Sequence, residues 1–315
     1  MRTFDGLLLC LAVLGCNGPA GPLRPDGGRS FDSGRRAEVD ASTVLEGGPV
    51  SGTLCGGIAV AGSIEVPAGE ELVICAGSTL TIAMGAGITV AGTLRLEGTA
   101  GARIQLRGEP RWAGLLVEGT LEADFTDVYD AQTAIVGRAG SSVRFDDGLI
   151  YAIALANVSL ANGGTFDRSR IFGGGTMSVS GGALSMTDSV LDLDHPGDSP
   201  DCLHVGGGTT TLEHVRITNC HCPIHITRAD SFTVTASILD GAAYPVMISN
   251  TTATFRDTVF EGTSADFDDI GGGIEADVAG NYYGGGAPSL ATDDASQFTG
   301  TDDFLTEPPA GAGPR

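Results

Sequence analysis

A segment that recurs about every 21 residues constrains the fold of this chain more than any other feature. In six of the seven copies an apolar residue is followed five positions later by a second apolar residue, as in Phe145 and Ile150. Asp130 replaces the second apolar residue in the first copy, and the other six copies keep it. Successive copies start 20, 21, 20, 26, 22 and 21 residues apart, at Phe125, Phe145, Phe166, Met186, Leu212, Val234 and Phe255.

The offset of five predicts a bend inside each copy. Alternate residues of a strand share a face, so residues five apart lie on opposite faces of a straight strand. Both can point into a core only if the chain turns between them. The third position of the copy is polar in most cases and is predicted to lie at this corner, where stacked Asp side chains could bond the backbone of the turn. The residues at this position are Asp127, Asp147, Arg168, Asp188, His214, Ala236 and Asp257.

The rest of the pattern favours short stacked strands. From about residue 58 onward no sustained 3.6-residue apolar period is present, and short runs rich in β-formers, such as residues 88–90 and 94–96, are separated by Gly, Asn, Asp or Ser. Leucine-rich repeats have a similar length but need a Leu and Asn consensus that this sequence lacks. We therefore expect an all-β solenoid, a parallel β-helix over residues 51–286 with roughly ten coils of about 20–22 residues.

The charge balance limits the partners that we expect. The chain has 39 acidic and 17 basic residues, a net charge of -22, and every basic residue is Arg. Without Lys, Schiff-base chemistry and the lysine of a phosphate-binding loop are excluded. Such an acidic surface repels nucleic acids, so cations, polysaccharides or cell-surface proteins are the expected partners of a monomeric protein.

The N-terminal segment has the features of an export signal. Residues 7–14 are apolar but too few to span a bilayer. Residues 13–16, Val-Leu-Gly-Cys, resemble the lipobox of bacterial lipoproteins, which implies a signal peptide over 1–16 and a lipid on Cys16. An ordinary cleaved signal is the alternative. The Pro- and Gly-rich residues 17–50 are predicted to be a flexible tether, and 287–315 a C-terminal cap or tail. This organisation places the protein in the bacterial cell envelope, at the outer membrane or cell surface, with the lipid as its only membrane contact.

Four motifs carry a resemblance to a known family. They are residues 77–82, 91–94, 112–117 and the closing element 281–284, Asn-Tyr-Tyr-Gly, with Tyr283 where Trp is usual. Over about residues 55–309 the chain resembles the right-handed parallel β-helix proteins of the pectate-lyase-like superfamily. The resemblance implies right-handed winding. It fixes no activity, since the superfamily includes lyases, hydrolases, epimerases and adhesins.

The longest interval between copies points to a candidate site. It contains an insertion over residues 192–202, and all five histidines lie in this interval or in the next coil. Alignment of the inward residues pairs Leu203 with Ile224, which stacks His204 on His225, about 5 Å apart and pointing outward. Two imidazoles beside carboxylates could bind a divalent metal or act as acid and base on a saccharide. A solvated ladder beside an ordinary acidic loop is the alternative. The candidate catalytic residues are Asp194, Asp198, Asp201, His204 and His225.

The acidic insertion also suggests a calcium site and a carbohydrate-active enzyme. Asp198 and Asp201 could ligate Ca²⁺, although their spacing follows no EF-hand rule. Residues 198–203 and 216–218 are similar, incompletely, to the Asp-Asp-Cys and Arg-Ile-Lys segments of polygalacturonases. In a pectate-lyase mechanism Arg216 or Arg228 would be the base.

The cysteines predict an oxidising compartment. Cys55 and Cys75 are 20 residues apart, as are Cys202 and Cys222, so one coil of separation brings each pair within disulfide range. Cys220 is then left over. A zinc site is the alternative, with Cys202, Cys220, Cys222 and His204 as its ligands.

Two functions follow from these features. The first is a non-catalytic lipoprotein that binds glycan, cation or protein at the cell surface. The alternative is a polysaccharide lyase or glycoside hydrolase that acts on acidic polysaccharide at residues 192–228.

Overall fold

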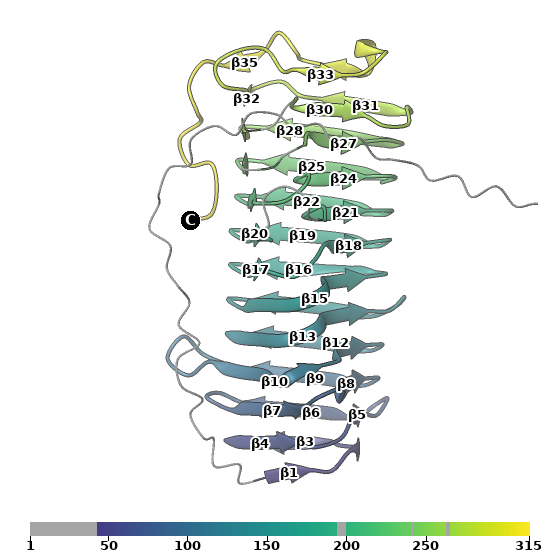
Figure 1. The fold of residues 1–315 in the computed structure, drawn as a ribbon, viewed down its shortest axis with the longest axis vertical. Helices are drawn as coiled ribbons and strands as arrows, with labels where there is room; N and C mark the ends of the chain where they lie inside the picture. Colours follow the sequence, from purple (N-terminus) through teal and green to yellow (C-terminus); the bar gives the residue numbers. More distant parts are fainter. Residues whose placement is uncertain (1–42, 194–199, 241, 243, 263–264) are drawn as a thin grey trace, which may run out of the picture. The chain divides into compact units, whose positions relative to one another are not determined.

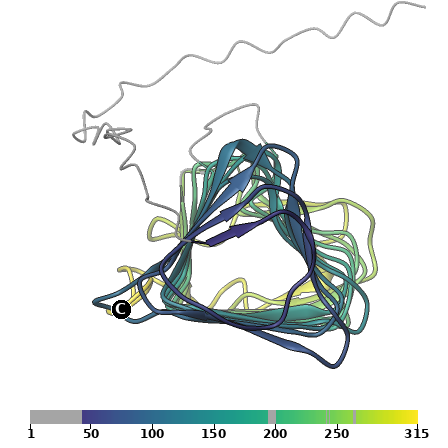
Figure 2. The same ribbon diagram turned by 90° about the horizontal axis from the view of Figure 1, so that it is seen from below.

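Stacked parallel strands make up nearly all of the described chain. The computed structural model describes residues 43–193, 200–240, 242, 244–262 and 265–315. Within these residues one helical turn is present, the 3-10 helix η1 (Ala295–Gln297). The strands form a parallel β-solenoid of about eleven turns, where roughly ten were expected (Figure 1). The all-β class and the coil-on-coil architecture are therefore confirmed. The cross-section of the solenoid has three sides (Figure 2).

Each side of the solenoid is a ladder of strands. One side is a 12-stranded sheet made of β3 (Gly52–Leu54), β6 (Glu71–Cys75), β9 (Thr93–Glu97), β12 (Thr120–Asp124), β14 (Ser142–Asp146), β16 (Gly163–Asp167), β19 (Ala183–Thr187), β22 (Thr209–Glu213), β25 (Ser231–Thr235), β28 (Thr251–Arg256), β31 (Ile274–Asp277) and β34 (Phe298–Thr299). The other sheet has 23 strands and covers the remaining two sides. Its first ladder contains β1 (Thr43–Leu45), β4 (Gly57–Val60), β7 (Thr79–Ala83), β10 (Ile104–Trp112), β13 (Thr126–Gly137), β15 (Leu149–Leu160), β17 (Arg170–Phe172), β20 (Val190–Asp192), β23 (Arg216–Thr218), β26 (Ile238–Asp240), β29 (Val259–Glu261), β32 (Asn281–Tyr282) and β35 (Phe304–Leu305). Its second ladder also uses β13 and β15 and contains β2 (Gly48–Pro49), β5 (Ile64–Val66), β8 (Gly87–Val90), β11 (Gly114–Val117), β18 (Met177–Val179), β21 (Leu203–Val205), β24 (Ile224–Ile226), β27 (Val246–Ile248), β30 (Phe267–Asp269) and β33 (Leu290–Ala291).

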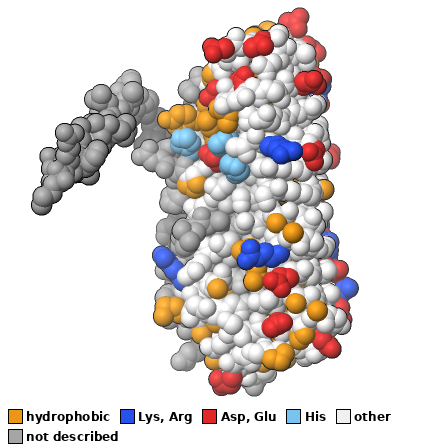
Figure 3. Space-filling model, turned by 90° about the vertical axis from the view of Figure 1, so that its right-hand side faces the viewer, with side chains coloured by type: hydrophobic (Ala, Val, Ile, Leu, Met, Phe, Trp, Pro, Cys, Tyr) orange, Lys and Arg blue, Asp and Glu red, His pale blue; other side chains and the backbone are white. Residues whose placement is uncertain are grey.

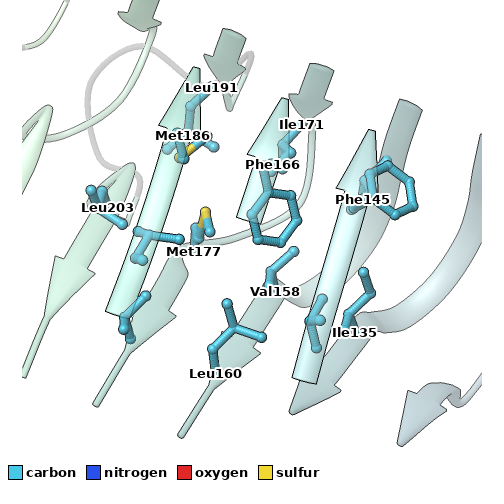
Figure 4. Close-up of a cluster of buried hydrophobic side chains, with 14 of the residues drawn as sticks. Ile135, Phe145, Val158, Leu160, Phe166, Ile171, Met177, Met186, Leu191 and Leu203 are labelled. Atoms are coloured by element: carbon cyan, nitrogen blue, oxygen red, sulfur yellow. The ribbon is translucent and has the colours of Figure 1, made fainter. Parts of the chain in front are cut away.

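Side chains one coil apart stack in the interior. Phe145 pairs in register with Phe166, and Phe166 pairs with Met186 in the next coil. The two phenyl rings lie 6.1 Å apart between centroids, and all three side chains are buried (Figure 4). Each such burial stabilises the fold by roughly 1.5–3 kcal/mol. Because a shift of one residue would turn this apolar row to solvent, the interior fixes the register of every coil.

The predicted corner is present, and it is a single residue in the left-handed backbone region. This conformation costs a residue other than Gly roughly 1–2 kcal/mol, and Asn or Asp adopts it most readily. The residues of the repeat that adopt it have φ between 47° and 53°, and they are Asp147, Arg168, Asp188, His214, Ala236 and Asp257. The bend lets the apolar residues on both sides, such as Phe145 and Ile150, point inward.

The first copy departs from this rule. There Phe125 itself has φ 44°, and Asp127 lies within strand β13, where its buried carboxylate pairs with Arg103. The predicted corner at Asp127 is therefore wrong. Asp130, which breaks the repeat pattern in this copy, has a second left-handed backbone with φ 61°.

Buried hydroxyl groups tie the corners together. The hydroxyl of Ser169, one residue after a corner, donates to the carbonyl of Phe145 at 2.9 Å. In the next coil the hydroxyl of Ser189 accepts from the backbone N–H of Ser169 at 3.0 Å. Ser237 repeats this arrangement by accepting from the N–H of Val215. The corner bonds that we expected from Asp carboxylates are thus supplied by the residue that follows the corner.

The solenoid was expected over residues 51–286. Within the described part of the chain, the strands run from Thr43 to Leu305. After β35 the chain returns along the corners, where the N–H of Gly313 donates to the carbonyl of Ala236 at 2.8 Å and the N–H of Arg315 donates to Asp188 at 3.3 Å. None of the described residues form a helix that is long and apolar enough to cross a membrane.

The corner conformation predicts an unusual effect of glycine. We expect Ala236→Gly to raise the free energy of unfolding by about 1 kcal/mol, because Gly adopts positive φ without a steric penalty. The control is Ala183→Gly in strand β19, which should lower the free energy by about 0.5–1 kcal/mol. Urea unfolding followed by fluorescence of the buried Trp112 measures both. Equal destabilisation by the two variants would contradict the role of the corner.

Candidate metal centre

Two histidines stack on the outer face of the second ladder. Strand β21 pairs with β24 so that Leu203 opposes Ile224 and His204 opposes His225. Leu203 and Ile224 are buried, which turns the intervening imidazoles outward. The ring centroids of His204 and His225 lie 4.8 Å apart, so the predicted histidine stack is confirmed.

Asp201 lies at the centre of a cluster of potential metal ligands. Its Oδ2 is 2.7 Å from Nδ1 of His225 and 3.9 Å from Nδ1 of His204. Its Oδ1 accepts a hydrogen bond from the thiol of Cys222 at 2.8 Å and lies 3.5 Å from Nδ1 of His221. Histidine side chains group around an acidic side chain on this face of the solenoid (Figure 3). We call Asp201 and its four neighbours, His204, His221, Cys222 and His225, the Asp201 cluster.

Backbone bonds hold the corner that carries His221 and Cys222. The N–H of Cys202 donates to the carbonyl of Cys222 at 3.0 Å, and the N–H of Tyr244 donates to the carbonyl of His221 at 2.8 Å. The His221 ring also stacks on the Tyr244 ring, with 4.0 Å between centroids. These contacts join three successive coils, so the cluster rests on the stacked scaffold and not on one loop.

One predicted disulfide is present and the other is wrong. Cys55 is bonded to Cys75, and the neighbouring residues Leu54 and Ile74 pair with the same offset of 20. Cys202 is bonded to Cys220, which leaves Cys222 as a free, buried thiol. The physical reason is the register of this coil.

Leu203 pairs with Ile224, an offset of 21, so Asp201 and not Cys202 lies opposite Cys222. A shift of one residue turns a side chain to the other face. The same bridge rules out the zinc site expected as an alternative at Cys202, Cys220, Cys222 and His204, because only Cys222 keeps a thiol.

The environment shifts two pKa values in the cluster. Burial tends to raise the pKa of Asp201, but the neighbouring His204, Cys222 and His225 outweigh burial and hold this pKa well below its usual value. Burial and the hydrogen bond to Asp201 raise the pKa of the Cys222 thiol. At neutral pH the cluster therefore contains a carboxylate and a protonated thiol.

Several predicted residues lie elsewhere. Asp194 and Asp198 are outside the described residues, so the predicted calcium pair Asp198 and Asp201 stays a prediction. Arg216 forms an ion pair with Asp240 at 2.6 Å, and Arg228 is exposed after strand β24. His214 lies at a corner, where its Nδ1 is 3.0 Å from the carbonyl oxygen of Gly311.

His221 and Cys222 were not predicted to be partners of Asp201. The signal was available for Cys222, because the pairing of Leu203 with Ile224 places Asp201 opposite Cys222. His221 is in a corner, where no strand alternation predicts the direction of a side chain.

The cluster suits a transition metal better than calcium. The donor atoms form two sets, Asp201 with His204 and His225, and Asp201 with His221 and Cys222, and within each set all donors lie within 4.8 Å of one another. Imidazole and thiolate ligands are typical of Zn²⁺ and its neighbours, whereas Ca²⁺ takes oxygen ligands. Zinc requires its nitrogen, oxygen and sulfur donors at roughly 2.0–2.3 Å.

Comparisons with known proteins do not identify a family or a function for this chain. No family model, curated protein or solved structure matches this chain. Membership of the pectate-lyase-like superfamily therefore stays a prediction.

Proposed function

We propose that this protein is a non-catalytic, metal-binding β-solenoid that holds a divalent transition metal ion with Asp201, His204 and His225. The observation that carries the proposal is the convergence of both imidazoles on Oδ2 of Asp201, at 2.7 and 3.9 Å. Three protein ligands of these types are a common set for Zn²⁺, and they leave a fourth position for water or a partner molecule.

The surroundings of the three ligands support reversible binding. The exposed fractions of the side chains are 19% for Asp201, 36% for His204 and 22% for His225, so an ion can reach them from solvent. Both histidines lie on paired strands, which limits the reorganisation needed on binding. The net charge of -22 also raises the local concentration of cations.

The geometry favours binding over cleavage of a polysaccharide. A glycosidase needs one carboxylic acid that stays protonated and a second carboxylate at a fixed distance. Asp201 is a poor acid at neutral pH because its neighbours hold its pKa low. Two hollows in the described surface lie away from the cluster, one lined by His214 and Asp257 and the other by Ser63 and Gly114.

We also propose that the protein is exported and anchored by a lipid in the bacterial cell envelope. Two disulfides support an oxidising compartment, and the sequence that ends at Cys16 supports a lipid anchor, although residues 1–42 lie outside the described part. We also infer that the solenoid winds to the right and is related to the pectate-lyase-like superfamily. The motifs at 77–82 and 281–284 support this inference, and parallel strand connections are almost always right-handed.

Zinc binding by the purified protein tests the proposal. We expect His225→Ala to weaken Zn²⁺ binding by about 100-fold or more, since loss of a group that only hydrogen-bonds to a metal ligand already costs roughly 10–100-fold. His214→Asn is the matched control. His214 lies at a corner, where its Nδ1 is 3.0 Å from the carbonyl oxygen of Gly311, so this variant should leave zinc binding unchanged. Isothermal titration calorimetry measures the affinity, and the melting temperature should rise with Zn²⁺ for the wild type and the control. Equal affinities for wild type and His225→Ala would contradict the proposal.

Membrane fractionation tests the anchor. In a Gram-negative host, the wild-type chain should appear in the membrane fraction and incorporate labelled palmitate. Cys16→Ala should do neither. A wild-type chain that is soluble and unlabelled after export would show that the signal is of the ordinary cleaved kind.

A further inference from the structure

We propose that Asp201 bridges two metal ions, the second of which is held by His221 and Cys222. This inference rests on the proposed function, because it assumes that the first ion binds Asp201, His204 and His225. It assigns a separate role to the two residues of the cluster that the first site does not use.

The two oxygens of Asp201 face different ligand pairs. Oδ2 is the nearer oxygen for His225 and His204, whereas Oδ1 contacts Cys222 at 2.8 Å and His221 at 3.5 Å. One carboxylate can thus supply an oxygen to each of two ions. Such bridged pairs in proteins place their metals about 3.5–4 Å apart.

The two pairs come from different parts of the fold. His204 and His225 project from the paired strands β21 and β24. His221 and Cys222 belong to the corner between β23 and β24, which the Cys202–Cys220 bridge and the stacking of His221 on Tyr244 hold in place.

The two sites differ in chemistry. The first has two imidazoles and partial exposure, so it keeps a position open for solvent. The second includes the buried Cys222, and a thiolate favours Zn²⁺, Co²⁺ or another metal that tolerates sulfur. Binding there releases the thiol proton of Cys222 to solvent, and the new metal–sulfur bond replaces the hydrogen bond to Oδ1.

Titration with Co²⁺ under anaerobic conditions distinguishes the sites. Equilibrium dialysis with metal analysis counts bound ions, and the near-ultraviolet sulfur-to-cobalt charge-transfer band reports the second site alone. We expect two ions and the band for the wild type. Cys222→Ala and His221→Ala should each retain one ion and lose the band. His204→Ala should retain one ion and the band, and Asp201→Asn should weaken both sites.

The outcomes separate this inference from the proposed function. One ion without the band would leave the first site intact and overturn the second. One ion whose band is lost in both Cys222→Ala and His204→Ala would indicate a single site with all donors, and would also overturn the inference. Absence of any bound cobalt, together with absence of zinc binding, would contradict the proposed function itself. Urea unfolding of each variant, with His214→Asn as control, shows that the solenoid remains folded.

Discussion

The register between neighbouring coils is the constraint on which the rest of this structure depends. Apolar side chains one coil apart stack in the interior, and a shift of one residue would expose a whole row. The corners follow from the same constraint, because residues five apart can both point inward only if one residue between them adopts positive φ. The register therefore determines which side chains lie in the core, at the corners and on the outer surface.

The Asp201 cluster is a consequence of this register on the outer face. The inward residues Leu203 and Ile224 place His204 on His225 without any specific attraction between the imidazoles. The offset of 21 brings Cys222 opposite Asp201, and the Cys202–Cys220 bridge holds the corner beside it. A regular scaffold of this kind can assemble ligands from positions far apart in the sequence and hold them close to binding geometry.

The sequence predicts side-chain positions well within strands, where alternate residues share a face. It predicts them less well at corners, where this alternation is lost. The solenoid, most corners and the His204–His225 stack could be predicted, since each follows from which residues point inward. The pairing of Cys202 with Cys222 was wrong because it used a uniform spacing of 20 where the local offset is 21. His221 was missed because corner residues have no alternation to orient them, and Asp127 was misplaced because the first copy bends at Phe125.

X-ray absorption at the zinc edge tests the central claim most directly, since it reports which side chains the register brings to the metal. For the zinc-loaded protein we predict imidazole scattering with Zn–N distances of about 2.0–2.1 Å. We also predict a sulfur shell at a Zn–S distance of about 2.3 Å, due to the ion bound by Cys222. A shell of oxygen atoms alone, without imidazole scattering, would contradict the account.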